Sequence, residues 1–267
     1  RNVCDMTKVI DNLKFVSDAG TASRFLSDDH LTCRQYDVKS YGAVGDGTTD
    51  DTSAINACLA AAFNEATDFG NNSSSTSRAV YFPPGIYKTT STIALPVNRY
   101  GHMIYGAGMG VSVINNVTSG STVFKTDGFM NSTMRDMSLR SAGGAGSICY
   151  DWDAASGGGN ASKENVWVSV EFSGAAVGLQ CGLLTQASET LFLNCLFKDL
   201  PLSGLYCRGG NTLNHVVLGG RFENCGTTTS RSAIDTQAGN VPLIRGVTFV
   251  NNGIAGDASS VDIGAYF

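Results

Sequence analysis

Four acidic residues are the first candidates for chemistry: Glu171, Glu223, Asp151 and Asp153. Glycoside hydrolysis needs two carboxyl groups, one as acid and one as base or nucleophile. They lie about 5 Å apart for retention and roughly 6.5 to 9.5 Å apart for inversion. Asp151 and Asp153 flank Trp152, so in a strand both carboxylates would share one face, close enough for retention or for binding a cation. A solvated turn is the simpler reading of that pair.

The elements that would position Glu171 and Glu223 follow from a repeat along the chain. Short apolar segments recur with central residues Leu139, Phe172, Phe197, Phe222 and Phe249, at spacings of 33, 25, 25 and 27 residues. Such periods are typical of solenoids, and the segments lack the 3.6-residue periodicity of helical repeats. We therefore expect stacked coils about 4.8 Å apart, with Phe172, Phe197 and Phe222 in one inner column.

A second series runs out of phase with the first. Its central residues are Ile148, Leu179, Leu205, Ile234 and Ile263, at spacings of 31, 26, 29 and 29 residues. Two or three short strands per coil fit these lengths. The same alignment predicts that Cys181 and Cys207 are neighbours, as small buried residues rather than as a disulfide.

Residues beside each central apolar residue should point outward, because strand side chains alternate between faces. Glu171 and Glu223 would then lie two coils apart, about 9.6 Å by stacking with a further offset along the strand, which favours inversion. The simpler alternative is that Glu223 forms a surface ion pair with Lys198. The candidate substrate-binding residues are Trp152, Tyr206, Arg208, Arg221 and Asp235. A lyase would instead use arginines such as Arg208, Arg221 and Arg245 to neutralise a uronate carboxylate.

Composition narrows the class of protein. A net charge of -5 argues against a nucleic-acid partner and against an anionic membrane, and no apolar run is long enough to cross a bilayer. The 32 glycines with only 5 prolines indicate many tight turns between short strands. The 8 cysteines show no zinc-binding spacing, so we expect neither a metal site nor a cofactor.

The N-terminal part divides into a linker or neck at residues 1–34 and a segment at 35–110 with a capping helix. The helix is predicted from the spacing of Ile55, Cys58, Leu59, Ala62 and Phe63, which places them on one face. Asp46, Asp50 and Asp51 precede it, and we assign them to the turn and the helix start rather than to a calcium loop. Residues 111–267 form the remaining coils, which we expect to continue beyond residue 267 or to be covered by another chain.

Three segments carry a family resemblance: residues 37–55 (DVKSYGAVGDGTTDDTSAI), 80–87 (VYFPPGIY) and 104–108 (IYGAG). They resemble the start of the pectate-lyase-3 group, which includes phage tailspikes, exo-β-1,3-glucanases and polygalacturonase-like proteins. The resemblance implies an all-β fold, a right-handed single-stranded parallel β-helix with an N-terminal capping α-helix. It also implies a polysaccharide partner, a homotrimer of the tailspike type, and a location outside the cell or on a virion surface.

Two functions remain open at this stage. The first is a tailspike-type depolymerase, a glycoside hydrolase in preference to a lyase, acting on an extracellular polysaccharide. The second is a non-catalytic β-helical adhesin or virion structural protein. A cleft with paired carboxylates and aromatic walls would favour the enzyme, which is the reading we prefer. A smooth outer face of Ser, Thr, Asn and Gly would favour the second function.

Overall fold

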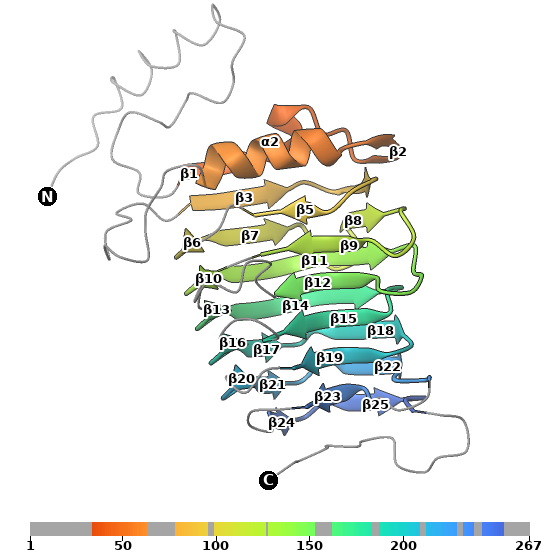
Figure 1. The fold of residues 1–267 in the computed structure, drawn as a ribbon. Coiled ribbons are helices and arrows are strands. Elements are labelled where there is room, and N and C mark those ends of the chain that lie inside the picture. The colour runs from red at the N-terminus through yellow and green to blue at the C-terminus, as the bar shows by residue number, and fades with distance from the viewer. Residues whose placement is uncertain are drawn as a thin grey trace, which may run out of the picture.

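Parallel strands stack from one end of the computed structural model to the other, and one helix lies across the N-terminal end (Figure 1). The structure describes residues 34–63, 78–95, 99–126, 128–152, 162–182, 187–208, 212–228, 232–237 and 242–253. Every described strand pair is parallel. The chain winds in one direction in stacked coils, as the repeat predicts, and forms the right-handed parallel β-helix that the family resemblance implies.

The largest sheet has 14 strands in two arms that share the long strands β11 (Thr133–Ser141) and β14 (Val166–Ser173). One arm contains β1 (Arg34–Asp37), β3 (Arg78–Phe82), β7 (Met103–Gly106), β17 (Leu191–Leu193), β21 (Val216–Leu218) and β24 (Leu243–Arg245). The other contains β2 (Asp46–Asp50), β4 (Gly85–Thr89), β8 (Ser112–Asn116), β18 (Leu196–Leu200), β22 (Arg221–Cys225) and β25 (Thr248–Val250). Each coil thus contributes two consecutive strand segments to this sheet.

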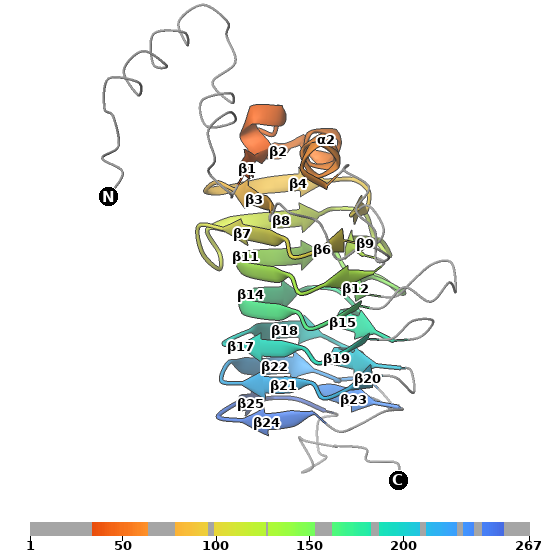
Figure 2. The same ribbon diagram turned by 90° about the vertical axis from the view of Figure 1, so that its left-hand side faces the viewer.

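A second wall lies across the core from the first, as Figure 2 shows. It is a sheet of 6 strands: β5 (Ile93–Ala94), β9 (Thr122–Lys125), β12 (Ile148–Trp152), β15 (Val177–Cys181), β19 (Ser203–Cys207) and β23 (Ile234–Thr236). Two small sheets complete the coils: β13 (Ser162–Lys163), β16 (Ala187–Ser188) and β20 (Thr212–Leu213), and the pair β6 (Arg99–Tyr100) and β10 (Phe129–Met130). The walls enclose the apolar core between them.

The predicted aromatic column is confirmed. Phe172, Phe197 and Phe222 are in register on neighbouring strands, and Phe249 continues the column. Successive ring centroids lie 4.8, 4.5 and 5.3 Å apart, with nearly parallel planes. Leu139 is the partner of Phe172 one coil earlier. Backbone hydrogen bonds hold successive coils about 4.8 Å apart, so like residues at the same register stack in the core.

The predicted alignment of the second series is confirmed for Leu179, Leu205 and Ile234, which are in register. The alignment of its first member, Ile148, is wrong. Tyr150, not Ile148, is in register with Leu179, and Ile148 pairs with Val177. Ile148 precedes Tyr150 by two residues and shares its face, so an apolar pattern alone does not separate them. The fully buried Tyr150 ring stacks on Phe124 with centroids 5.5 Å apart. Ile263 lies outside the described residues.

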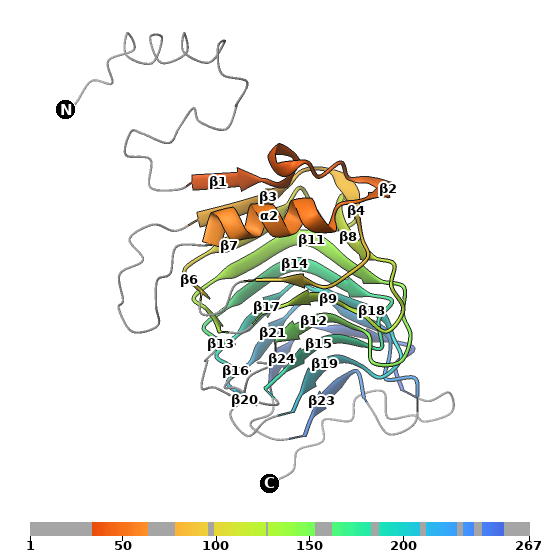
Figure 3. The same cartoon turned by 45° about the horizontal axis from the view of Figure 1, so that its top comes forward.

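The predicted capping helix is α2 (Thr52–Phe63), which lies over the first coils (Figure 3). All five predicted apolar residues are almost fully buried against the core: Ile55, Cys58, Leu59, Ala62 and Phe63. The Asp50 carboxylate accepts hydrogen bonds from the Thr52 backbone and hydroxyl. Asp46 and Asp51 likewise accept backbone N–H groups of their own turn, so the acidic group has a structural role. A short 3-10 helix, η2 (Val38–Tyr41), precedes it.

No described helix has the length and apolar character required to cross a bilayer. The predicted neck lies outside the described residues except for Arg34, the first residue of β1.

Each coil bends at positions with left-handed backbone conformation, and these positions also stack. One column runs through Asn131, Glu164, Glu189 and Asn214, with φ between 46° and 56°. Left-handed conformation is uncommon for non-glycine residues, and Asn tolerates it best. The two glutamates in this column are therefore under more backbone strain than the asparagines.

Candidate functional site

The outer face of the six-stranded sheet carries a row of polar residues in register. The row runs from Lys125 through Asp151, Gln180 and Tyr206 to Asp235, one residue per coil. The alternate residues of the same strands, such as Leu179 and Cys181, are buried in the core, so this row lies on the opposite face of the sheet, where Asp151 is 9% and Tyr206 3% exposed. We call these five residues the polar ladder. It contains Asp151, Tyr206 and Asp235 from the residues predicted from sequence.

Long polar contacts join Lys125, Asp151 and Gln180 of the polar ladder, and Arg208 lies beside them. Lys125 Nζ lies 3.5 Å from Asp151 Oδ2, and Gln180 Nε2 donates to Asp151 Oδ1 at 3.4 Å. Arg208 Nη1 donates to Gln180 Oε1 at 3.5 Å, and its guanidinium carbon lies 5.3 Å from the centre of the Tyr206 ring. Contacts of 3.4 to 3.5 Å are at the outer limit of a hydrogen bond. These three contacts are therefore weaker than ordinary hydrogen bonds.

A cavity of about 130 Å³ opens beside the polar ladder. Gln180, Tyr206 and Arg208 supply its polar lining, and Ile148, Val177 and Leu202 supply apolar lining. Pockets for whole small molecules are usually ~300 Å³ or more. This cavity is thus suited to a substituent of a larger molecule that lies mainly on the open face.

Trp152 needs a correction, because sequence reasoning placed it among the substrate-binding residues. Its side chain is fully buried and packs edge to face on Trp167, with ring centroids 6.2 Å apart. Trp152 is also the register partner of the buried Cys181. Strand alternation turns Trp152 into the core whenever its neighbour Asp151 points outward. Asp153 lies outside the described residues, so its pairing with Asp151 remains a prediction.

Glu171 is held firmly in the wall of the large sheet. Arg140 donates twice to its carboxylate, both at 3.0 Å, while Ser138 donates at 2.6 Å and Ser173 at 2.8 Å. Burial raises the pKa of Glu171, but the hydrogen bonds from Arg140, Ser138 and Ser173 outweigh it and hold the pKa below its ordinary value. A carboxylate with four donors is a poor proton donor, so this geometry favours a structural role.

Glu223 is also paired. Its carboxylate lies 2.8 Å from Arg221 Nη2 and 3.8 Å from Lys198 Nζ, the simpler alternative recognised in the sequence. Glu171 is in register with Leu196 and Arg221, so Glu223 is offset from it by two coils and two residues. That offset separates their backbones by about 12 Å. The structure therefore does not bring the two glutamates close enough to contact one small ligand together.

Three residues of the metal-ligand type meet in the core, where no sequence motif indicates them. Cys181, Cys207 and His215 have ligand atoms that all lie within 4.8 Å of one another. They come from β15, β19 and the residue before β21, so their spacing along the chain resembles no known zinc motif. Lys125 was also missed, since it lies in a coil before the repeat becomes regular. Only the register of the strands in the folded structure shows that Lys125 belongs to the ladder and that Cys181, Cys207 and His215 lie together.

The stacked parallel coils define a β-helix protein of the pectate-lyase-like class. The chain belongs to the rhamnogalacturonase A/epimerase, pectate lyase-like family, which it matches over residues 35–257. The family resemblance found in the sequence is confirmed.

Curated relatives match shorter stretches. A probable glucan endo-1,3-beta-glucosidase of Arthroderma benhamiae is 38% identical over 97 residues, covering 35% of this chain and 10% of that protein. Mannuronan C5-epimerase AlgE2 of Azotobacter vinelandii is 39% identical over 87 residues, covering 31% of this chain and 8% of that protein. The chain thus spans a tenth or less of these relatives.

Among solved structures, ORF18 of Geobacillus virus E2 has a TM-score of 0.58 at 20% identity. The match covers 81% of this chain and 42% of that chain. At this level of identity the likeness shows the shared fold, independently of any shared activity.

Proposed function

We propose that the protein binds an extracellular polysaccharide along the polar ladder and depolymerises it there. The observation that carries the proposal is the contrast between two polar networks. The contacts of Asp151 with Lys125 and Gln180, and of Gln180 with Arg208, are 3.4 to 3.5 Å long and lie beside a cavity, whereas the hydrogen bonds of Glu171 are 2.6 to 3.0 Å long and satisfy both of its oxygens. The polar ladder is therefore the network available to a ligand.

The ladder presents one side chain every ~4.8 Å along the stack. A glycan lying parallel to the stack would meet an ammonium group, a carboxylate, an amide and a phenol in turn. The names of the curated relatives support this class of ligand, since both describe action on a polysaccharide. A substituent of one sugar would occupy the cavity beside Gln180, Tyr206 and Arg208.

Hydrolysis is the proposed reaction, with Asp151 as one of its two carboxyl groups. Asp235 is three coils away from Asp151 in the same row, about 14 Å, which exceeds the separation used by either class of glycosidase. Asp153 remains the proposed partner, because alternation in an extended strand would place it on the same face as Asp151.

Elimination from a uronate is the second candidate, and the position of Arg208 favours it. Arg208 and Gln180 border the cavity together, so Arg208 can neutralise the carboxylate of a uronate and the Gln180 amide can donate a hydrogen bond to it. The Tyr206 ring adjoins both, and its phenolate form would be the group that accepts the proton at C5.

Incubation with a panel of capsular, algal and plant polysaccharides tests the proposal. New reducing ends without absorbance from unsaturated uronates would establish hydrolysis, and both signals together would establish elimination. Binding to a glycan without either signal would instead support the non-catalytic adhesin or virion structural protein. Absence of both binding and cleavage across the panel would contradict the proposal.

A homotrimer on a virion or cell surface is part of the same proposal, and the resemblance to tailspikes supports it. Light scattering coupled to size-exclusion chromatography tests the trimer directly, since a mass of one chain would contradict it.

A further inference from the structure

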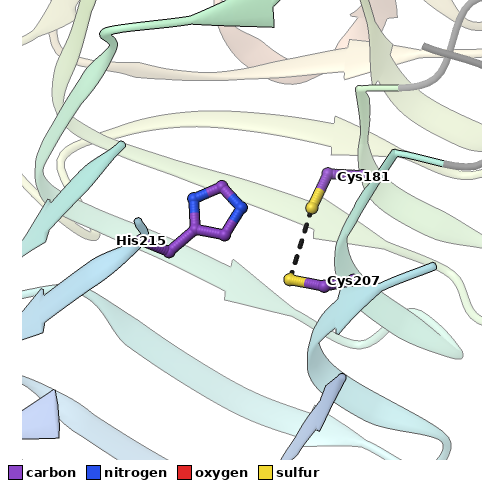
Figure 4. Close-up of side chains that lie close together, drawn as sticks. All are labelled: Cys181, Cys207 and His215. Atoms are coloured by element: carbon purple, nitrogen blue, oxygen red, sulfur yellow. Dashed lines mark hydrogen bonds between the residues drawn. The ribbon is translucent and has the colours of Figure 1, made fainter. Parts of the chain in front are cut away.

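The core contains a cluster of two thiols and an imidazole that the polysaccharide reaction does not use. Cys181 and Cys207 occupy one inner column, in register on β15 and β19, and Cys181 Sγ lies 3.4 Å from Cys207 Sγ. His215 approaches from the opposite wall, and its ring points toward the two sulfur atoms (Figure 4). All three side chains are buried, with His215 1% exposed.

His215 is unusual because neither of its ring nitrogens has a hydrogen-bond partner. Buried polar groups nearly always have one. The same column contains Asn165 and Thr190 in the two preceding coils, and both of those side chains are hydrogen-bonded. His215 therefore lacks the hydrogen bonds that the other two residues of its column make. Its imidazole points toward the two thiols instead.

We propose that Cys181, Cys207 and His215 form a binding site for a thiophilic metal ion, with Zn²⁺ as its simplest occupant. Thiolates and imidazole are the ligands that zinc prefers, and tetrahedral Zn–S bonds of about 2.3 Å place two sulfur atoms about 3.8 Å apart. The observed separation is 3.4 Å, and all three ligand atoms lie within 4.8 Å of one another. Small side-chain movements would thus complete the site.

Charge also fits a divalent ion. Binding Zn²⁺ releases one proton from each thiol, so two thiolates, a neutral imidazole and the ion form a group with no net charge. Such a group can be buried in an apolar core, where an isolated charge could not.

A disulfide between Cys181 and Cys207 is the competing chemistry, because neighbouring parallel strands bring Cα atoms within disulfide range. It would leave both nitrogens of His215 without a partner, whereas a metal ion uses one of them. A metal site therefore accounts for the positions of Cys181, Cys207 and His215, whereas a disulfide accounts only for those of Cys181 and Cys207.

The test uses the full chain, purified under reducing conditions and given Zn²⁺ alone. We expect one bound zinc per chain after dialysis, and we expect Co²⁺ to give thiolate-to-metal charge-transfer absorption. His215→Asn keeps both thiols and introduces the residue found at Asn165 in the same column. It should weaken zinc binding about 100-fold or more, since even residues that only support metal ligands contribute 10- to 100-fold.

Cys207→Ala should abolish stoichiometric binding, with Cys225→Ala as the matched control. Cys225 is also a buried free thiol, but it lies outside the cluster and its Sγ donates to the Phe197 carbonyl. The proposal is overturned if the reduced protein binds no zinc, or if His215→Asn and Cys225→Ala bind it equally. An oxidised chain two hydrogens lighter that cannot be loaded after reduction would establish the disulfide instead. If Cys207→Ala does not fold, the wild-type and His215→Asn proteins still decide the outcome.

Discussion

The ring planes of Phe197 and Phe222 lie only 7° apart, with centroids separated by 4.5 Å. Phe172 stacks on the other side of Phe197, so this ring is packed on both faces inside the core. Phe197→Ala would leave a cavity that the neighbouring coils cannot collapse to fill, because backbone hydrogen bonds fix the spacing between coils. We expect it to lower the free energy of unfolding by about 3–5 kcal/mol. Chemical denaturation measures this.

Leu193→Ala is the control for that experiment, since Leu193 in the adjacent strand β17 is 38% exposed. It should change the free energy of unfolding by no more than about 0.5 kcal/mol. Equal effects of the two substitutions would contradict the assignment of the aromatic column as the main core.

Glu189 offers a prediction of increased stability. It is exposed and adopts φ of 56°, a left-handed conformation that asparagine tolerates better. Glu189→Asn should raise the free energy of unfolding by about 0.5–1 kcal/mol. The reverse substitution at the same column, Asn214→Glu, should lower it by a similar amount, because Asn214 is exposed with φ of 55°. Thermal unfolding of both variants checks the pair, and shifts of the same sign would contradict it.

The regular part of the fold could be predicted because stacking forces like residues to recur. Phe172, Phe197 and Phe222 are 25 residues apart, and this spacing alone places them in one column. Ile148 was misplaced by two residues because Tyr150 on the same face is also largely apolar. Periodicity therefore identifies the face of a strand more securely than its register.

The site was less predictable, because polar contacts depend on coils that are distant in sequence. Arg140, which neutralises Glu171, lies 31 residues before it, and Lys125 precedes Asp151 by a whole coil. The cluster at His215 joins opposite walls, so neither periodicity nor motif spacing indicates it. Alternation did place Asp151 outward, and the same rule applied to Trp152 would have placed it in the core.

Glu171 gives a prediction about pH. Glu171→Gln should lower the free energy of unfolding at pH 7 by about 1–3 kcal/mol, because the amide cannot replace the charged acceptor of Arg140 and two hydroxyls. The pKa of Glu171 is lower in the folded state than its unfolded value of about 4.3. Its contribution is therefore complete above that unfolded pKa and is lost as pH falls through the folded pKa.

Denaturation of both proteins between pH 7 and pH 3 measures this effect. We expect the difference between wild type and Glu171→Gln to be constant near neutral pH and to shrink in acid. A difference that grows in acid would contradict the assignment. Glycan cleavage by Glu171→Gln should persist, and its complete loss with the fold intact would instead make Glu171 catalytic.

Asp151 is the residue on which the proposed reaction depends. Asp151→Asn removes a carboxyl group from the polar ladder but retains its shape and its contact with Gln180. Loss of a general acid or base lowers a rate by about 100-fold or more, so we expect cleavage of a glycan substrate to fall by that factor. Asp136→Asn is the matched control, because Asp136 lies in the large sheet on β11 and its φ of 56° accommodates asparagine. Circular dichroism establishes that both variants fold. Equal activity of the two variants would place the reaction elsewhere on the β-helix, whereas selective loss in Asp151→Asn locates it at the polar ladder.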